Sequence, residues 1–298
     1  MYWTNEKREK GERKMIITKK AKKFIRRILK ILGQPEMLIL PGQLAFFLLL
    51  AIVPTFTIIA YVASFFNVSI DFASSLILKM FGSDIGGLLI PFVRDIHFDG
   101  KLIIPLLVAF YAASGGASSI IVTSNQLYHL DNTPFIKRKI KGIIMIMILV
   151  SLVTFLLLIP VLGGRVVELI RYVNMNETVT KSIESVIHFL EGPISWIIIF
   201  IMIKIIYTMA PDETIPSSNN NIGTLFTTIG LSLVTFVYSL YATKVAHYDI
   251  LYGGLSHFVV LMIWLYLLAY IIIIGIAINA EEYEIRKKLA EKEEEKSP

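Results

Sequence analysis

Six long apolar stretches, each bounded by charged or turn-forming segments, limit what this chain can fold into more than any other feature. Several of them contain about 18 or more consecutive residues that are almost free of charge, the length that a helix needs to cross a bilayer. Hydrophobic residues make up 55% of the whole sequence. We therefore predict an all-α, polytopic membrane protein with six transmembrane helices, and we exclude water-soluble folds.

No linker rich in Pro, Ser or Gly divides the apolar stretches into groups, so we expect a single helical domain with charged ends. The expected organisation is a basic tail over residues 1–41, a six-helix domain over 42–280 and a charged tail over 281–298. The predicted spans are Gln43 to Phe66, Leu102 to Ser124, Gly142 to Leu162, Ile194 to Met209, Ile222 to Thr243 and Leu255 to Ala280.

The distribution of Lys and Arg orients these spans. Six crossings place both termini on one side of the membrane, and that side carries 21 Lys and Arg residues, whereas the other side carries seven. Basic residues gather on the cytoplasmic side of membrane proteins. The sequence therefore predicts that both termini are cytoplasmic.

The basic segment before the first span has the pattern of a surface helix. Between Ile16 and Leu32, apolar residues fall on one helical arc and Lys and Arg fill the other, which is typical of a helix that lies on anionic lipid headgroups. A nucleic-acid-binding tail is the competing interpretation. It lacks interleaved aromatic residues and would leave the apolar arc in water, so we expect no nucleic-acid partner.

Two segments on the external side are too long to be simple turns. Thr178 to Glu191 has apolar residues on one helical face and polar residues on the other, which predicts a short amphipathic helix at the membrane interface. Apolar pieces between Asn67 and Asp99 are broken by Gly and Pro. This pattern favours interfacial or partly re-entrant helices over another crossing.

Four of the spans carry motifs in a recognisable order. The first reads GQLAFFLLLAIVPTF with Pro54 inside it, and the second reads AASGGASSIIVTSNQLYHLDN. The fourth closes on YTMAP, and the last contains YGGLSHFVVLMIWLYLLAYIIIIGIAINA. In this order and spacing the segments resemble the YihY/virulence factor BrkB family, whose members were once labelled ribonuclease BN. The resemblance implies a six-helix bacterial inner-membrane protein, without implying a chemical activity.

Polar side chains from several spans form the candidate site. On the second span, Ser114, Ser118 and Asn125 fall on one helical face. The orientation of the spans also brings Asn125 to the cytoplasmic depth of polar residues on three other spans. We expect a polar pathway or packing layer made of Gln43, Ser114, Ser118, Asn125, Tyr207 and Asn279.

This layer has two interpretations. The first is hydrogen bonding and close packing between helices, which is common wherever helices meet in lipid. The second is the inner vestibule of a pathway for an amphiphilic or lipid-linked substrate. The preferred function is therefore movement or export of an envelope amphiphile, and the alternative is a non-transporting scaffold for envelope assembly.

An enzyme is disfavoured by the motifs. The five histidines show no HExxH or HxxxH spacing, the chain has no cysteine, and neither a GxSxG elbow nor a Walker A loop is present. We expect no catalytic residue, no metal and no organic cofactor. The expected partners are membrane lipids, with anionic headgroups at the N-terminal helix, while a homo-oligomer or envelope-assembly partners stay open.

Overall fold

The computed structural model describes residues 25–26, 28–65, 74, 78, 90, 103–152, 177–244 and 256–294. All regular secondary structure within these ranges is helical, in agreement with the predicted all-α class. A further helix without a label in the figures spans residues 135–152. The labelled elements are α2 (Glu36–Phe65), α5 (Ile103–Leu127), α7 (Glu177–Met209), the 3₁₀ helix η2 (Ser217–Asn220), α8 (Asn221–Lys244) and α10 (Ser256–Glu294).

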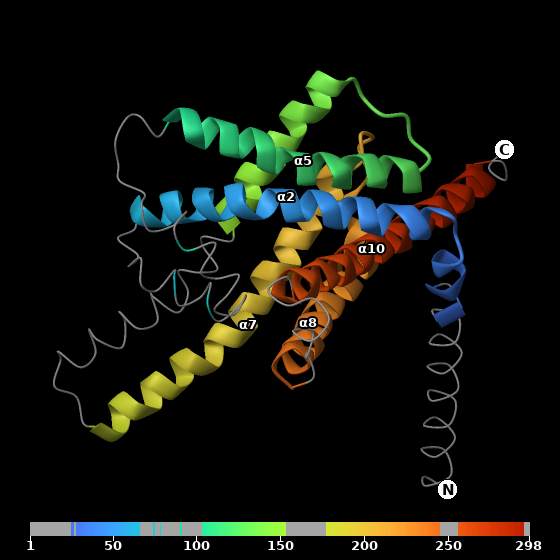
Figure 1. Cartoon of the computed structure of the whole chain (residues 1–298). Coiled ribbons are helices and arrows are strands. Elements are labelled where there is room, and N and C mark those ends of the chain that lie inside the picture. Colours follow the sequence, from blue (N-terminus) through green and yellow to red (C-terminus); the bar gives the residue numbers. More distant parts are fainter. Residues whose placement is uncertain are drawn as a thin grey trace, which may run out of the picture.

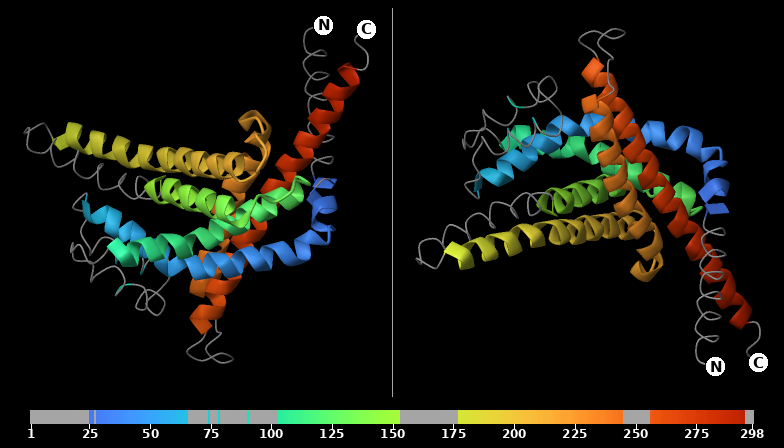
Figure 2. Two further views of the ribbon diagram at one scale, coloured as in Figure 1. Left: turned by 90° about the horizontal axis from the view of Figure 1, so that it is seen from above. Right: turned by 90° about the horizontal axis from the view of Figure 1, so that it is seen from below.

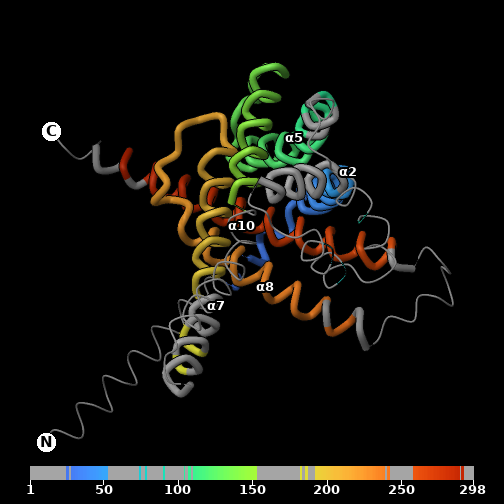
Figure 3. Tube along the Cα trace, turned by 90° about the vertical axis from the view of Figure 1, so that its left-hand side faces the viewer, coloured from blue at the N-terminus to red at the C-terminus, as the bar shows by residue number. Residues whose placement is uncertain are grey.

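The helices pack in two crossing groups (Figure 1). Helix α5 lies along α2, and α10 packs against α8, α2 and α5. Helix 135–152 and α7 run side by side, and the α8–α10 pair crosses them (Figure 2). Figure 3 shows the same relation from the side, with α2 and α5 together above α8 and α10. The buried apolar core therefore forms where α2, α5 and α10 meet, around Leu44, Ala113, Ile121 and Ile273.

Large apolar side chains also cover the outer faces of the helices. On α8, Leu225, Ile229 and Leu233 are exposed at a spacing of four residues, which places them on one helical face. Hydrocarbon around a membrane helix tolerates such a face, whereas water would not. In the part of the chain that the structure describes, three helical segments have the length and composition to cross a bilayer: Gly192–Met209, Ser217–Tyr238 and Phe258–Lys288. The number of six spans stays a prediction.

Helix ends differ from the predicted spans in informative ways. Helix α7 begins at Glu177 and continues through Pro193, so the predicted interfacial helix and the fourth span form one continuous helix. A proline inside a membrane helix removes one backbone hydrogen bond, which neighbouring groups can replace. Helix α10 also continues to Glu294, beyond the predicted end of the last span.

Two of the predicted segments lie mostly outside the described residues. Of the N-terminal surface helix, residues 25–26 and 28–32 are described and helical, and the side chain of Ile31 is buried in the core. Of Asn67 to Asp99, only residues 74, 78 and 90 are described. The third predicted span is described as helix as far as residue 152.

Candidate functional site

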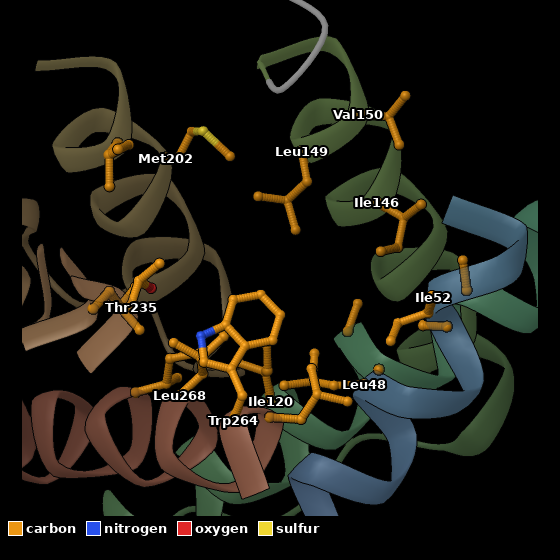
Figure 4. A pocket seen from close by; sticks show the side chains of 18 of the residues that line it. Leu48, Ile52, Ile120, Ile146, Leu149, Val150, Met202, Thr235, Trp264 and Leu268 are labelled. Carbon is orange, nitrogen blue, oxygen red and sulfur yellow. The ribbon is translucent and has the colours of Figure 1, made fainter. Parts of the chain in front are cut away.

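A partly open cavity of about 610 Å³ lies between the helices of the bundle. Its walls come from α2, α5, helix 135–152, α7, α8 and α10, so it forms only when all six helices are assembled. Figure 4 shows Met202 and Thr235 on one side, Leu149, Ile146 and Ile52 on the other, and the indole of Trp264 below them.

Apolar side chains dominate the lining of this cavity. The Trp264 indole is stacked on the ring of Tyr238, with 5.5 Å between the ring centroids, and this contact orients the indole. Ser232 and Thr235 contribute hydroxyl groups, and the Ser232 Oγ donates a hydrogen bond to the Thr228 carbonyl oxygen at 3.1 Å. The cavity therefore suits hydrocarbon better than a sugar or an ion.

Next to the cavity residue Ile272, polar groups join α7, α8 and α10. The Tyr207 hydroxyl donates to the Ile272 carbonyl oxygen at 2.7 Å and lies 2.6 Å from the Thr227 hydroxyl. Asn279 is fully buried, and its Oδ1 accepts a hydrogen bond from the Gly223 backbone N–H at 2.7 Å. Because Gly223 is in the first turn of α8, Asn279 caps a helix that belongs to another span.

A second polar cluster lies where α5 and α7 end. The Asp212 carboxylate accepts hydrogen bonds from the Asn125 amide at 2.6 Å, from the Thr133 backbone N–H at 3.1 Å and from the Thr133 hydroxyl at 3.0 Å. Lys141 of helix 135–152 pairs with the same carboxylate at 2.7 Å. We call Asn125, Thr133, Lys141 and Asp212 the Asp212 cluster. It ties α5, the following loop, helix 135–152 and the end of α7 together.

The Asp212 cluster has a strong electrostatic character. The Asp212 side chain is only 8% exposed. Burial tends to raise the pKa of its carboxyl group, but hydrogen bonds from Lys141, Thr133 and Asn125 outweigh burial and lower the pKa from 3.8 to about 2. Lys141 also donates to the carbonyl oxygens of Ala210 at 3.0 Å and Pro211 at 2.7 Å, just after the end of α7. A cation there complements the negative end of the α7 dipole.

The two polar clusters are connected through the end of α5. Asn220 accepts a hydrogen bond from the Tyr128 hydroxyl at 3.2 Å and donates one to the Tyr207 carbonyl oxygen at 3.2 Å. The Tyr128 ring also meets the ring of Tyr283 on α10 edge to face, with 5.9 Å between centroids. Buried polar contacts therefore continue from α5 through η2 to α7 and α10.

The six residues singled out from the sequence fall in different surroundings. Asn125 belongs to the Asp212 cluster, while Tyr207 and Asn279 join α7, α8 and α10. The Ser114 hydroxyl donates to the Tyr111 carbonyl oxygen of its own helix at 2.6 Å. Gln43 and Ser118 line a separate groove of about 280 Å³ between α2, α5 and helix 135–152.

Sequence reasoning missed Asp212, Thr133 and Lys141. A signal for the first was present, because Asp212 directly follows the YTMAP motif and is an acid next to a predicted membrane helix. Its three partners are 71 to 87 residues away in the sequence, and periodicity within one helix does not reveal such pairs.

Comparison with known proteins shows to which family the chain belongs. Residues 32–298 match the model of the family described as virulence factor BrkB. The chain belongs to the BrkB family. The family resemblance expected from the order of the motifs is thus confirmed.

Several BrkB-related proteins resemble the chain over much of its length. The ribonuclease-like protein YfkH of Bacillus subtilis is 30% identical over 191 residues, covering 64% of this chain and 68% of that protein. A UPF0761 membrane protein of Vibrio atlanticus is 25% identical over 286 residues, covering 91% and 86%. The UPF0761 membrane protein YihY of Salmonella typhimurium is 27% identical over 118 residues, which is 39% of each chain. No solved structure matches the chain.

The names of these relatives and the long apolar helices both indicate that the chain is a membrane protein. The ribonuclease-like name is that of the Bacillus protein alone.

Proposed function

We propose that this BrkB-family protein moves or exports an amphiphile of the cell envelope across the bacterial inner membrane. The observation that carries the proposal is the apolar cavity of about 610 Å³ at the meeting point of six helices. Its volume falls in the range of about 300 to 1,000 Å³ that small-molecule sites occupy. Closely packed helices leave few spaces of this size, so the cavity is larger than helix packing alone requires.

The cavity walls indicate which part of the substrate they would hold. Leu149, Met202 and Leu268 present flexible apolar surface, which suits an acyl or isoprenoid chain. On α5 the lining residues are mostly small, so this helix fills little of the cavity with side chains; they include Ala113, Gly116 and Ala117. A chain lying here would leave its polar headgroup nearer to one end of the bundle.

In the proposed orientation both termini and the Asp212 cluster are on the cytoplasmic side. The support for this orientation is the excess of basic residues on the terminal side of the six predicted spans. Lys141 and the preceding bases in helix 135–152 belong to that side.

A non-transporting scaffold for envelope assembly is the second candidate. The observation in its favour is that none of Asn125, Tyr207 and Asn279 lines the cavity: Tyr207 and Asn279 hydrogen-bond to neighbouring helices, and Asn125 hydrogen-bonds to Asp212 in the loop after α7. These residues therefore support packing, as interhelical polar groups commonly do. Filling the cavity should leave a scaffold functional but should block a transporter, and this difference separates the two candidate functions.

Filling the cavity tests the proposal. Leu149→Trp and Met202→Trp add bulk from opposite walls, and we expect the double variant to slow movement of a fluorescent phospholipid in proteoliposomes by about tenfold or more, equivalent to about 1.4 kcal/mol in the barrier. Movement is measured as the fraction of probe that an external, impermeant reductant can bleach over time.

The matched control is Met147→Trp, because Met147 is on the same helix as Leu149 but is 53% exposed and does not line the cavity. This variant should move the probe like the wild type. Unchanged movement by the folded double variant, or wild-type movement no faster than in empty liposomes, would favour the scaffold.

A further inference from the structure

A second hollow, the groove of about 280 Å³, opens on the face of α5 opposite the central cavity. Its α5 residues recur at positions i, i+3, i+4 and i+7 and so share one helical face. Helix α2 forms one side, and the first residues of helix 135–152 form the other. The lining residues are Gln43, Phe47, Gly115, Ser118, Ser119, Val122, Phe135, Arg138 and Lys139.

Two cations of this groove have no acidic partner among the described residues. Within the described part of the chain, neither Arg138 nor Lys139 forms an ion pair, whereas Lys141 in the next turn is paired with Asp212. Lys139 instead donates to the Tyr111 carbonyl oxygen at 2.8 Å, and its ammonium is 3.9 Å from the centroid of the Tyr111 ring. Partial burial lowers the pKa of Lys139. A bound anion would offset this desolvation.

Hydroxyl groups on the floor of the groove also lack partners. The hydroxyl oxygens of Ser118 and Ser119 are buried and form no hydrogen bond within the structure described. Ser119 is 4% exposed as a residue. Buried hydroxyl groups normally have a partner, and each of these could donate to a ligand oxygen. The groove therefore contains two hydroxyl donors in addition to the two cations.

The start of helix 135–152 adds to the positive field. Phe135 is in its first turn, where backbone N–H groups have no partner within the helix, whereas the Arg138 N–H already donates to the Pro134 carbonyl oxygen at 3.1 Å. Three bases, Lys137, Arg138 and Lys139, are unfavourable at this end of a helix dipole unless an anion is close. The same groove has the apolar walls Phe47, Val122 and Phe135.

We propose that this groove binds the phosphate headgroup of an anionic phospholipid, with Arg138, Lys139 and the Ser119 hydroxyl as its ligands. The apolar walls select a lipid over a free anion, because they would otherwise face water. The site lies outside the cavity of the proposed transport function and does not depend on it.

Lipid-dependent stability of the full-length protein in detergent tests the site. Dioleoyl phosphatidylglycerol should raise the melting temperature more than dioleoyl phosphatidylcholine does. In Arg138→Gln the half-saturating concentration of phosphatidylglycerol should increase about tenfold, the effect of losing one charge-assisted hydrogen bond. Ser119→Ala should increase it less, in the same direction.

The matched control is Lys137→Gln, since Lys137 is an exposed base of the same turn that does not line the groove. It should respond to phosphatidylglycerol like the wild type, and the basic N-terminal segment contributes equally in every variant. An equal loss in Lys137→Gln and Arg138→Gln would reveal general surface charge and overturn the proposal. An equal melting shift with inorganic phosphate at the same concentration would overturn the assignment to a lipid. No lipid movement is measured, so the outcome is independent of the transport experiment.

Discussion

At the scale of single residues, Asp212 has the most consequential surroundings. One carboxylate accepts four hydrogen bonds, from Lys141, Asn125 and two donors of Thr133. These donors come from three places in the chain and meet only in the folded state. Removing the charge would leave the Lys141 ammonium without its counter-ion, which costs more than losing an exposed pair.

The pKa of Asp212 predicts a pH dependence. Because folding lowers this pKa from 3.8 to about 2, the carboxylate contributes stability that is fully present above about pH 4 and is lost as the pH falls towards 2. The contribution is on the order of 2 kcal/mol. Asp212→Asn should lower the melting temperature at pH 7 and flatten its decline between pH 4 and 2, measured by thermal unfolding in detergent.

Glu213→Gln provides the comparison for this experiment. Glu213 is the neighbouring acid, and it accepts an exposed hydrogen bond from the Tyr283 hydroxyl at 3.3 Å. Its replacement should leave the acid decline close to that of the wild type. If Asp212→Asn kept the full acid decline, the stabilising role of the carboxylate would have to be abandoned.

At the scale of the helix, α8 and α10 cross at a pair of glycines. A Cβ atom on Gly223 would overlap the Gly275 carbonyl oxygen and the Asn279 side chain. A Cβ on Gly275 would overlap the Thr227 and Tyr207 hydroxyls. Small residues let membrane helices approach closely, and here the approach also permits the hydrogen bonds of Tyr207 and Asn279.

Adding a single methyl group at this crossing should therefore separate the helices. We expect Gly223→Ala and Gly275→Ala each to lower the free energy of unfolding by about 1 to 3 kcal/mol, the usual cost of overpacking. Gly42→Ala is the matched control, since a Cβ there meets nothing within 4 Å. Thermal unfolding in detergent provides the measurement, and destabilisation by Gly42→Ala equal to that of the two crossing variants would argue against the steric explanation.

At the scale of the whole molecule, the proposed topology can be tested without disturbing native thiols, because the chain contains no cysteine. Single cysteines replace Ser218 in η2 and two residues outside the described ranges, Asn176 and Ser297. In intact cells, an impermeant thiol reagent should label only Asn176→Cys. The other two variants should react after lysis, and labelling of Ser297→Cys in intact cells would contradict cytoplasmic termini.

Local features of the sequence predicted the helices well. Apolar runs bounded by polar residues placed the fourth span up to Met209 and the fifth at Ile222 to Thr243, close to the ends of α7 and α8. A continuous apolar run is enough to predict a membrane helix, because a helix in lipid forms all its backbone hydrogen bonds within the segment. The order of the motifs along the chain was likewise enough to indicate the BrkB family.

Only the tertiary structure decided which residues of different helices come into contact. In a water-soluble bundle an apolar stripe identifies the buried face of a helix. A membrane helix is apolar towards both lipid and protein, so its apolar residues do not show which face is buried in the protein. Periodicity therefore could not indicate that Leu149 and Met202 face one cavity or that Lys141 reaches Asp212. Composition and hydropathy determined that this chain forms membrane helices, whereas the cavity and the polar clusters depend on close packing between distant segments.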